Sequence, residues 1–422
     1  MKEYKSYPVE VSLGAQTKTY SPEFQNDGQY AYAWKKVLLM AHGKAVVRCL
    51  CAGPGERRLS IHSRSNSDRF HLARFPETGP EHAEDCIFYG VDPNASGMGA
   101  YKRGVVQELD DGNTKIKLKI GLLQRVTTAP TDTDAQTSNP RTTLQSRVSQ
   151  SSMTLLGLLH YLWTQAALNT WTPAMQGKRN LGVVHHHLMR VAMTTYAGRV
   201  KLAQNLLIGT PSPEGQQPRL NQAKAISASN ERRRLVVAAP LARHREGLEN
   251  ARMLPISGFH GIPYLDMTSE LWQITKRRFG QEMSAWIAGN PVIMFAQTDP
   301  PKTAAGGLQA HVIDLALMWM TKDWIPVDSG FEALLAERLV QENRRFEKPL
   351  RFDSHEQVFP DFWLKDTGAP VPMEVWGMAT PDYQARKQEK IAHYDSSYGP
   401  GDWWSWNGAA GDELPELPPR SL

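Results

Sequence analysis

The first 124 residues show the alternation of polar and apolar side chains that is typical of half-buried β-strands. The alternation is clearest over residues 58–62, 69–75 and 115–120. A short apolar run over residues 46–51 ends at the turn signal Ala52-Gly53-Pro54-Gly55. This pattern predicts a β-rich domain over residues 1–125.

The next segment has almost no apolar side chains and is dominated by Thr, Ser, Gln, Asp and Pro. Such a segment cannot bury enough surface to offset the entropy lost on ordering. We therefore expect a flexible linker over residues 126–152.

Residues 153–325 mix helical and strand patterns, which predicts a helical or α/β middle domain. An apolar helix opens this region near Leu155, and a second helix is predicted over Val183–Leu207. Residues 211–230 read as a loop, and two apolar runs, residues 235–239 and 291–295, read as strands.

Residues 326–422 follow the order helix, three strands, helix, strand. The first helix begins at Ser329, where Ser329-Gly330-Phe331-Glu332 also matches a capping box. The remaining elements are expected as strands over 349–353, 358–364 and 371–378, a helix over 382–394 and a last strand over 403–406. The second helix carries Tyr383, Lys387, Lys390 and Tyr394 on one stripe.

Composition narrows the function classes only slightly. The chain has 422 residues, 41% apolar and 22% charged, which allows two to four globular domains. It contains no run of eighteen apolar residues, and its start lacks the apolar region of a secretory signal, so we expect no membrane partner. Three cysteines cannot form a closed disulfide framework, which favours a reducing, cytoplasmic setting.

The net charge of +5 is too small to indicate a nucleic-acid partner by itself. Between residues 151 and 290, however, 16 Lys or Arg face 7 Asp or Glu, a local excess of +9. A solvated basic face and a surface for a phosphate backbone explain this excess equally well. The run His185-His186-His187 lies in a predicted helix, where its side chains point in different directions, and it is assigned no site.

All three cysteines lie in one segment of the N-terminal region. Cys49 and Cys51 are one residue apart, and His82 and Cys86 follow about thirty residues later. Three thiolates and an imidazole are a ligand set that zinc takes in closed structural sites. We predict structural Zn²⁺ on these four residues, with His62 or His71 as alternatives to His82; the competing interpretation is buried free cysteines.

Two carboxylates stand in apolar surroundings near the C-terminus. Asp361 is flanked by Phe359 and Phe362, and Glu374 lies between Met373 and Val375. A buried acid is costly unless it is paired, and a cation shared between two adjacent strands is the simplest partner. Mg²⁺ binds through one or two carboxylates together with water and phosphate oxygens.

These residues and the element order resemble the PD-(D/E)xK nuclease superfamily. Pro360-Asp361 resembles its "PD", Glu374 its second acid, and Glu332 the acid that many members supply from the first helix. The resemblance implies a restriction-endonuclease-like αβββαβ domain over 326–422 that binds catalytic Mg²⁺ or Mn²⁺ through Asp361, Glu374 and Glu332. Glu332 is equally explained as the capping residue.

The chain departs from the superfamily where its lysine is expected, because Trp376 stands two residues after Glu374. A subset of the superfamily supplies the lysine from the following helix. Lys387 and Lys390 are so placed here, and Lys390 is the preferred stand-in. The resemblance thus implies the catalytic set Glu332, Asp361, Glu374, Lys390 and Lys387.

The whole chain also resembles an uncharacterised bacterial family carried on plasmids and integrative elements. Our first hypothesis is a metal-dependent DNA endonuclease of a mobile element or a defence or transfer system. The second is an inactive nuclease-like subunit that binds DNA or assembles with other subunits of such a complex, and the third is a scaffolding protein. The chain has no G-x-x-x-x-G-K-[ST] loop, so strand separation would need a partner.

Overall fold

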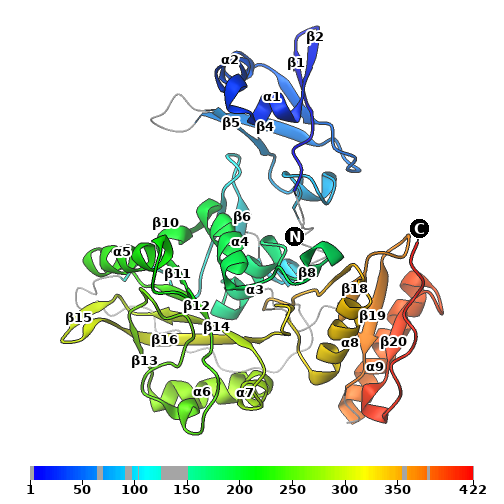
Figure 1. Ribbon diagram of the computed structural model, residues 1–422. Coiled ribbons are helices and arrows are strands. Elements are labelled where there is room, and N and C mark those ends of the chain that lie inside the picture. Colours follow the sequence, from blue (N-terminus) through cyan, green and yellow to red (C-terminus); the bar gives the residue numbers. More distant parts are fainter. Residues whose placement is uncertain are drawn as a thin grey trace, which may run out of the picture.

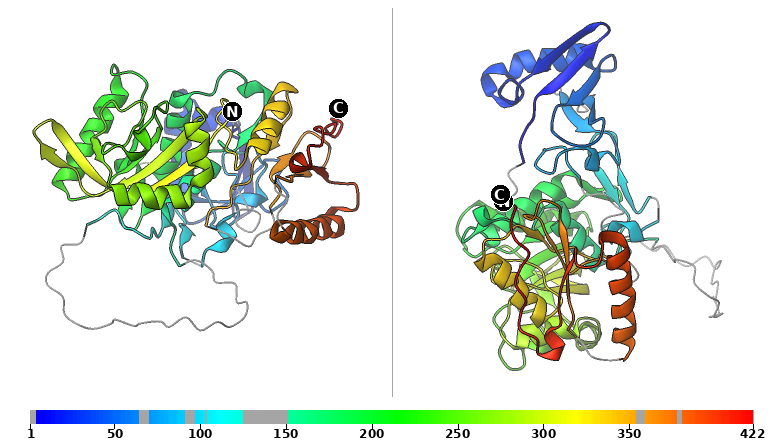
Figure 2. Two further views of the ribbon diagram at one scale, coloured as in Figure 1. Left: turned by 90° about the horizontal axis from the view of Figure 1, so that it is seen from below. Right: turned by 90° about the vertical axis from the view of Figure 1, so that its right-hand side faces the viewer.

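The computed structural model describes residues 4–63, 70–90, 97–102, 104–124, 151–353, 359–377 and 381–421. Within these ranges the chain is a mixed α/β protein with four β-sheets. Figures 1 and 2 show the N-terminal sheet standing apart from a larger body formed by the middle and C-terminal segments. The linker expected over 126–152 falls almost entirely on residues 125–150, which lie outside the described residues.

The N-terminal sheet is antiparallel throughout, in the order β2-β1-β3-β4-β5. Its third strand, β3, buries Val47 and Cys49 and exposes Val46 and Arg48, the alternation that a half-buried strand requires. The helix α2 packs against β5 and buries Leu38. The elements are β1 (Val9–Leu13), β2 (Gln16–Tyr20), α1 (Pro22–Asn26), η1 (Gly28–Tyr30), α2 (Ala31–Ala41), β3 (Val46–Cys49), β4 (Arg58–Ser63), β5 (Phe70–Arg74) and η2 (Gly79–Glu81).

A second, four-stranded sheet joins two distant parts of the sequence. Its order is β10-β9-β7-β6, and β7 pairs in parallel with β9. The strands are β6 (Val106–Glu108), β7 (Thr114–Ile116), β9 (Thr195–Ala197) and β10 (Val200–Lys201), and η4 (Gly97–Ala100) precedes them.

The middle sheet has the order β11-β12-β14-β16-β13, with β15 pairing on β16. The helix α3 packs on β14 and β16 from one side, and α6 and α7 pack from the other (Figure 1). Because helices cover both faces, every residue of β14 is buried. The strands are β11 (Leu206–Ile208), β12 (Val236–Pro240), β13 (Tyr264–Asp266), β14 (Val292–Thr298), β15 (Lys302–Ala304) and β16 (Gly307–Trp319). The helices are α3 (Leu155–Gln165), η5 (Pro173–Met175), α4 (Leu181–Thr194), η6 (Leu202–Gln204), α5 (Gln216–Asn230), η7 (Leu248–Asn250), α6 (Ser269–Arg278) and α7 (Gly280–Ile287).

The C-terminal segment has the element order that its pattern predicts, a helix, three strands, a helix and a strand. Its sheet has the order β20-β19-β18-β17-β8, in which β20 is parallel to β19 and the other pairs are antiparallel. The edge strand β8 (Thr170–Trp171) comes from the middle of the sequence. The other elements are α8 (Gly330–Gln341), β17 (Phe346–Glu347), β18 (Phe362–Leu364), β19 (Val371–Val375), α9 (Pro381–Tyr398), β20 (Trp404–Trp406) and η8 (Gly408–Ala410).

Three local predictions were wrong. The helix expected over Val183–Leu207 ends at Thr194, where Thr195 enters β9 and Gly198 turns the chain at φ 65°. The loop expected over residues 211–230 is largely helix α5, which buries the small residues Ala225 and Ala228 in place of a leucine stripe. Residues 349–353 are not a strand, because the Asp353 carboxylate accepts hydrogen bonds from the backbone N–H and the hydroxyl of Thr154, at the start of α3.

The hydrophobic side chains form three clusters, which span Val9–Phe88, Met98–Phe352 and Trp171–Trp406 along the sequence. The first two divide between Phe88 and Met98, whereas the sequence predicts a boundary near residue 125. Met98, Val105, Ile116 and Leu122 belong to the same hydrophobic cluster as the residues of the middle sheet. None of the helices in the described ranges has the length and apolar character needed to cross a membrane.

Candidate functional site

The cysteines and His82 are brought together by two loops of the N-terminal module. Cys49 is the last residue of β3, and Cys51 follows in the turn. His82 ends η2, and Cys86 closes the next turn, where its N–H donates to the carbonyl of Ala83. The two loops touch at Gly53, where a Cβ would lie 2.1 Å from the carbonyl oxygen of Glu81.

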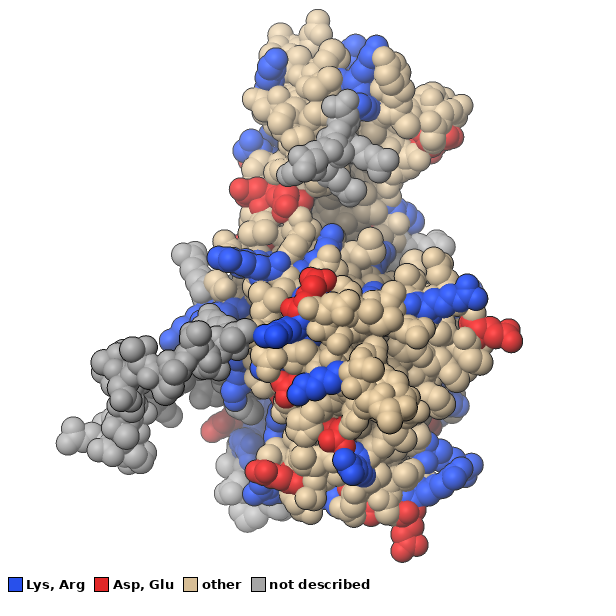
Figure 3. Space-filling view, turned by 90° about the vertical axis from the view of Figure 1, so that its left-hand side faces the viewer, with Lys and Arg blue, Asp and Glu red and all other residues tan. Residues whose placement is uncertain are grey.

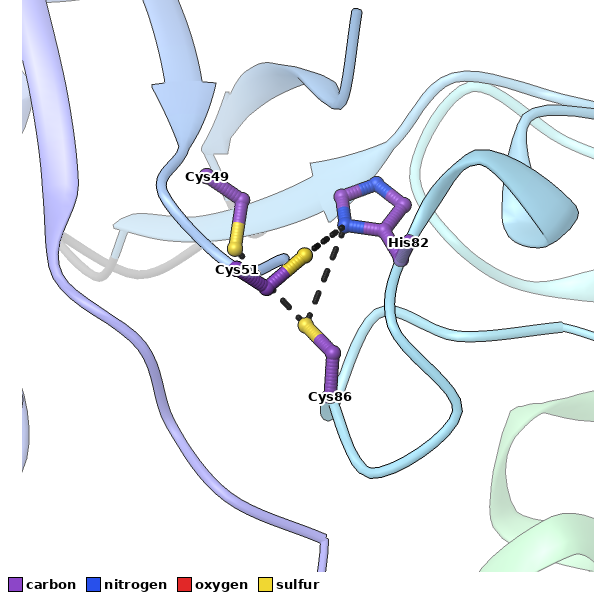
Figure 4. Close-up of side chains that lie close together, drawn as sticks. All are labelled: Cys49, Cys51, His82 and Cys86. Carbon is purple, nitrogen blue, oxygen red and sulfur yellow. Dashed lines mark hydrogen bonds between the residues drawn. The ribbon is translucent and has the colours of Figure 1, made fainter. Parts of the chain in front are cut away.

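The four ligand atoms lie within 4.8 Å of one another, and all four residues are buried (Figure 4). Cys49 Sγ is 3.7 Å from Cys86 Sγ, and His82 Nδ1 is 3.6 Å from Cys51 Sγ and 3.8 Å from Cys86 Sγ. In a tetrahedral site with Zn–S of about 2.3 Å and Zn–N of about 2.0 Å, S···S separations are about 3.8 Å and S···N separations about 3.6 Å. The cluster therefore could hold a metal ion such as zinc.

The surroundings of the sulfurs suit thiolate ligands. Backbone N–H groups of Ala83 and Phe88 donate to Cys51 Sγ and Cys86 Sγ. The hydrogen bond between Cys49 and Cys86 lowers the pKa of the Cys86 thiol and raises the pKa of the Cys49 thiol, because the two sulfurs share one proton. Burial acts against ionisation of both thiols. All three cysteines are free thiols, and thiolates are the form that binds metal.

His62 and His71 do not belong to this cluster. They are partners across β4 and β5, where His62 Nε2 lies 2.7 Å from the hydroxyl of Ser60 and His71 Nε2 lies 3.1 Å from the carbonyl of Asp111. Of the alternatives considered from sequence, His82 is the histidine beside the cysteines.

Asp361 and Glu374 are held by the β18–β19 hairpin. Since Phe362 pairs with Met373, the residues Asp361 and Glu374 come next to each other at the end of the hairpin. The N–H of Asp361 donates to the carbonyl of Met373 at 2.9 Å, and the N–H of Val375 donates to Asp361 Oδ2 at 2.8 Å. Both acids are buried, with exposed fractions of 5% and 1%.

The stripe on α9 packs against this hairpin. Lys390 Nζ lies 2.9 and 2.8 Å from the two carboxylate oxygens of Glu374, and Tyr394 OH donates to Oε1 at 2.6 Å. Burial and, to a smaller extent, the charge of Asp361 raise the pKa of Glu374, and Lys390 and Tyr394 lower it. The net result is a pKa of about 7. Lys387 Nζ lies 5.1 Å from the ring centre of Trp376, one turn from Lys390.

Glu332 is both a capping residue and a buried ion-pair partner. Its N–H donates to Ser329 Oγ, and its Oε2 accepts from the N–H of Asp328 at 3.0 Å. The same oxygen lies 2.8 Å from Lys348 Nζ, which also reaches Asp328 Oδ2 at 2.9 Å. Burial raises the pKa of Glu332 and the Lys348 ammonium opposes this rise.

Sequence reasoning missed Lys348 and Arg351. Lys348 is 1% exposed, and Arg351 has its guanidinium 3.7 Å from Asp361 Oδ1. Neither residue stands in a motif, and only the pairing of the sheet brings them to the acids.

The acids do not form a compact ligand group by themselves. Within the described part of the chain, one group of three or more His, Cys, Asp or Glu side chains is arranged to hold a metal ion. This group is the cluster of Cys49, Cys51, His82 and Cys86. Asp361, Glu374 and Glu332 instead alternate with Lys390, Arg351 and Lys348 in a network of ion pairs.

The basic excess of the middle segment does not form one continuous patch on the face shown in Figure 3, where Asp and Glu lie between the Lys and Arg side chains. His185, His186 and His187 lie in α4 and belong to no described metal-ligand group.

A family model described as "Protein of unknown function (DUF1173)" matches residues 25–409. The chain belongs to this uncharacterised family. The matched range includes the group Cys49, Cys51, His82 and Cys86 as well as the ion pairs around Asp361, Glu374 and Glu332. Searches of curated proteins and of solved structures gave no match.

Proposed function

We propose that this DUF1173 protein is a metal-dependent nuclease whose C-terminal acids cleave the phosphodiester bonds of DNA. The observation that carries the proposal is the contact between Lys390 on α9 and Glu374 on β19, 2.8 Å from nitrogen to oxygen. A lysine supplied from the helix after the second acid is the arrangement that the displaced-lysine nuclease pattern requires.

The C-terminal topology supports the same proposal. The order α8, β17, β18, β19, α9, β20 matches the αβββαβ order that the nuclease resemblance implies. Asp361 and Glu374 lie beside each other on the hairpin of its second and third strands. The resemblance itself remains the basis for naming the reaction.

Asp361 and Glu374 suit Mg²⁺ or Mn²⁺ as a donor set, because hard cations bind through one or two carboxylates completed by water and phosphate oxygens. A bound cation would supply an activated water and offset the charge that develops on the phosphate. Lys390 then positions the water or the scissile phosphate. Glu332 accepts hydrogen bonds from Lys348 and from the N–H of Asp328, and in this proposal it is a third acid near the cation.

We further propose that the Cys49, Cys51, His82 and Cys86 cluster binds zinc and has a structural role. With four protein ligands, the site has no open position for a substrate or water. From the family resemblance, we propose that the protein cleaves DNA as part of a mobile element or of a defence or transfer complex.

One observation favours a second candidate, an inactive nuclease-like subunit that binds DNA or assembles with partners. Glu374 already has an ammonium at 2.8 Å, and Glu332 has another. A fold that has lost its metal needs such pairs to keep its acids stable in the interior.

The test is incubation of the zinc-loaded protein with supercoiled, linear, single-stranded and branched DNA and with RNA, with and without added Mg²⁺ or Mn²⁺. We expect metal-dependent cleavage of at least one DNA form by the wild type and none by Asp361→Asn. If the folded wild type binds DNA but cleaves no form under any condition, the inactive subunit is the better description.

A further inference from the structure

The helical corner of the N-terminal module carries an aromatic cluster that the proposed nuclease site does not use. Phe24 stacks on Tyr20 at 5.3 Å and on Tyr30 at 5.2 Å between ring centres. Trp34 of α2 meets Tyr20 and Phe24 at 5.4 and 6.1 Å. None of these four rings is buried, so the cluster lies at the surface.

A pocket of about 440 Å³ lies beside this cluster. Trp34 and Leu38 of α2 and Phe70 of β5 provide its apolar lining, and Asp27, Lys35 and His71 provide polar groups. Its volume falls in the range of about 300–1,000 Å³ that small-molecule sites occupy. An aromatic lining with a few polar groups suits a flat, polar-edged ring.

His71 of β5 lies in the wall of the pocket, and its Nε2 is 3.1 Å from the carbonyl oxygen of Asp111. This contact fixes the position of the imidazole ring beside the pocket.

The helix α2 beside the pocket carries the basic residues Lys35 and Lys36 and no acid. The acids nearest in sequence are Asp27, which lines the pocket, and Glu23 of α1. Lys36 Nζ lies 4.7 Å above the ring of Tyr32, which is 70% exposed. Exposed rings beside ammonium groups are how proteins bind the bases and phosphates of a single strand.

We infer that this face binds single-stranded nucleic acid, with one unstacked base in the pocket beside Trp34 and a neighbouring base on Tyr32. Lys36 contacts a phosphate. A duplex keeps its bases stacked and paired, so it cannot fill the pocket. The inference deepens the proposed function, from which it takes the nucleic-acid ligand, and it names the strand form that the N-terminal module holds.

The test is the affinity of the full-length, zinc-loaded protein for fluorescently labelled oligothymidylate, measured by anisotropy without Mg²⁺ or Mn²⁺. We expect Trp34→Leu and Lys36→Glu each to weaken binding on the order of tenfold, and Tyr32→Ser to weaken it less. Tyr264→Ser and Lys302→Glu are matched controls on exposed residues of the middle sheet and should leave binding unchanged.

The melting temperature and zinc content of each variant show whether a loss of binding results from a loss of folding. Tyr32 is 70% exposed, so its replacement should leave the fold intact. The inference is overturned if the folded variants bind as tightly as the wild type. It is also overturned if duplex DNA or free thymidine monophosphate competes as well as the oligonucleotide. The two proposals are tested separately, because binding is measured without Mg²⁺ or Mn²⁺. Absence of cleavage in the assay with added metal would refute the nuclease proposal without affecting the binding result.

Discussion

Glu374 is the least exposed of the three acids in the C-terminal network. This residue is 1% exposed, and burial and the charge of Asp361 raise its pKa to about 7, even though Lys390 and Tyr394 act in the opposite direction. A carboxyl with such a pKa changes charge close to neutral pH, which is a common property of functional acids.

The raised pKa predicts a specific effect of pH on stability. Because the pKa of Glu374 is higher in the folded than in the unfolded protein, the protonated carboxyl stabilises the fold. This contribution to the free energy of unfolding is fully present below the ordinary pKa near 4.5 and is lost as the pH rises through about 7. Its full size is on the order of 3 kcal/mol. Thermal unfolding of wild type and Glu374→Gln from pH 5 to pH 8 should show the variant gaining stability relative to the wild type as the pH rises. Parallel pH profiles would show that Glu374 titrates normally.

Lys390 and Lys387 are a matched pair for testing which ammonium acts on the substrate. Lys390 contacts Glu374, whereas Lys387 lies over the ring of Trp376. We expect Lys390→Ala to slow cleavage by about a hundredfold while metal binding is retained, because a positioned charge at the reacting phosphate is lost. Lys387→Ala should have a much smaller effect. Equal rates for the two variants would contradict the assignment of Lys390.

At the scale of elements, the grouping of Cys49, Cys51, His82 and Cys86 depends on how closely the loop after β3 approaches the loop after η2. A Cβ on Gly53 would lie 2.1 Å from the carbonyl oxygen of Glu81, next to His82, so the loops would have to separate. We therefore expect Gly53→Ala to lower zinc content and the melting temperature of the module without altering a ligand.

Gly28→Ala is the control for this change, because a Cβ there meets nothing within 4 Å. Zinc analysis and thermal unfolding of both variants provide the measurement. Full zinc occupancy in a stable Gly53→Ala protein would show that the contact between the loops is dispensable.

The elements that sequence predicts best are those whose pattern depends on local contacts. After residue 326, apolar periodicity predicts both helices and the strands β18, β19 and β20, whereas β17 lies at Phe346–Glu347 and not over 349–353. Ser329 caps α8 as its S-x-x-E spacing predicts. The stripe of Tyr383, Lys387, Lys390 and Tyr394 contacts β19 and the residues that follow it. Helix α5 escaped prediction because it buries alanines and Asn221, which produce no apolar period.

At the scale of the whole molecule, pairings between distant segments cannot be predicted from the hydrophobic pattern. Strand β8 at residues 170–171 completes the C-terminal sheet, and β7 joins β9 across the segment expected as a linker. Lys365 lies 2.6 Å from Glu347 and 3.4 Å from Glu84, which connects the metal-ligand loop with the C-terminal sheet. Such contacts depend on which surfaces meet after the elements form, and a pattern along one chain does not encode them.

The three cysteines and His82 were predictable because zinc ligands must be few, of fixed types and close together. Lys348 and Arg351 were not, since a charged residue in a sequence is far more often solvated than buried against acids. The proximity of Asp361, Glu374 and Lys390 was therefore predictable from the sequence, and the positions of Lys348 and Arg351 beside the acids were not. The roles assigned to these residues stay predictions.

The nuclease proposal requires that Asp361 and Glu374 hold a catalytic cation. The most direct test is the titration of zinc-loaded wild type and Asp361→Asn with Mn²⁺, followed by electron paramagnetic resonance at neutral pH. We expect one bound Mn²⁺ in the wild type and none in the variant, with equal zinc content and the same melting temperature in both. Equal Mn²⁺ binding by the two proteins, or no binding by either, would contradict it.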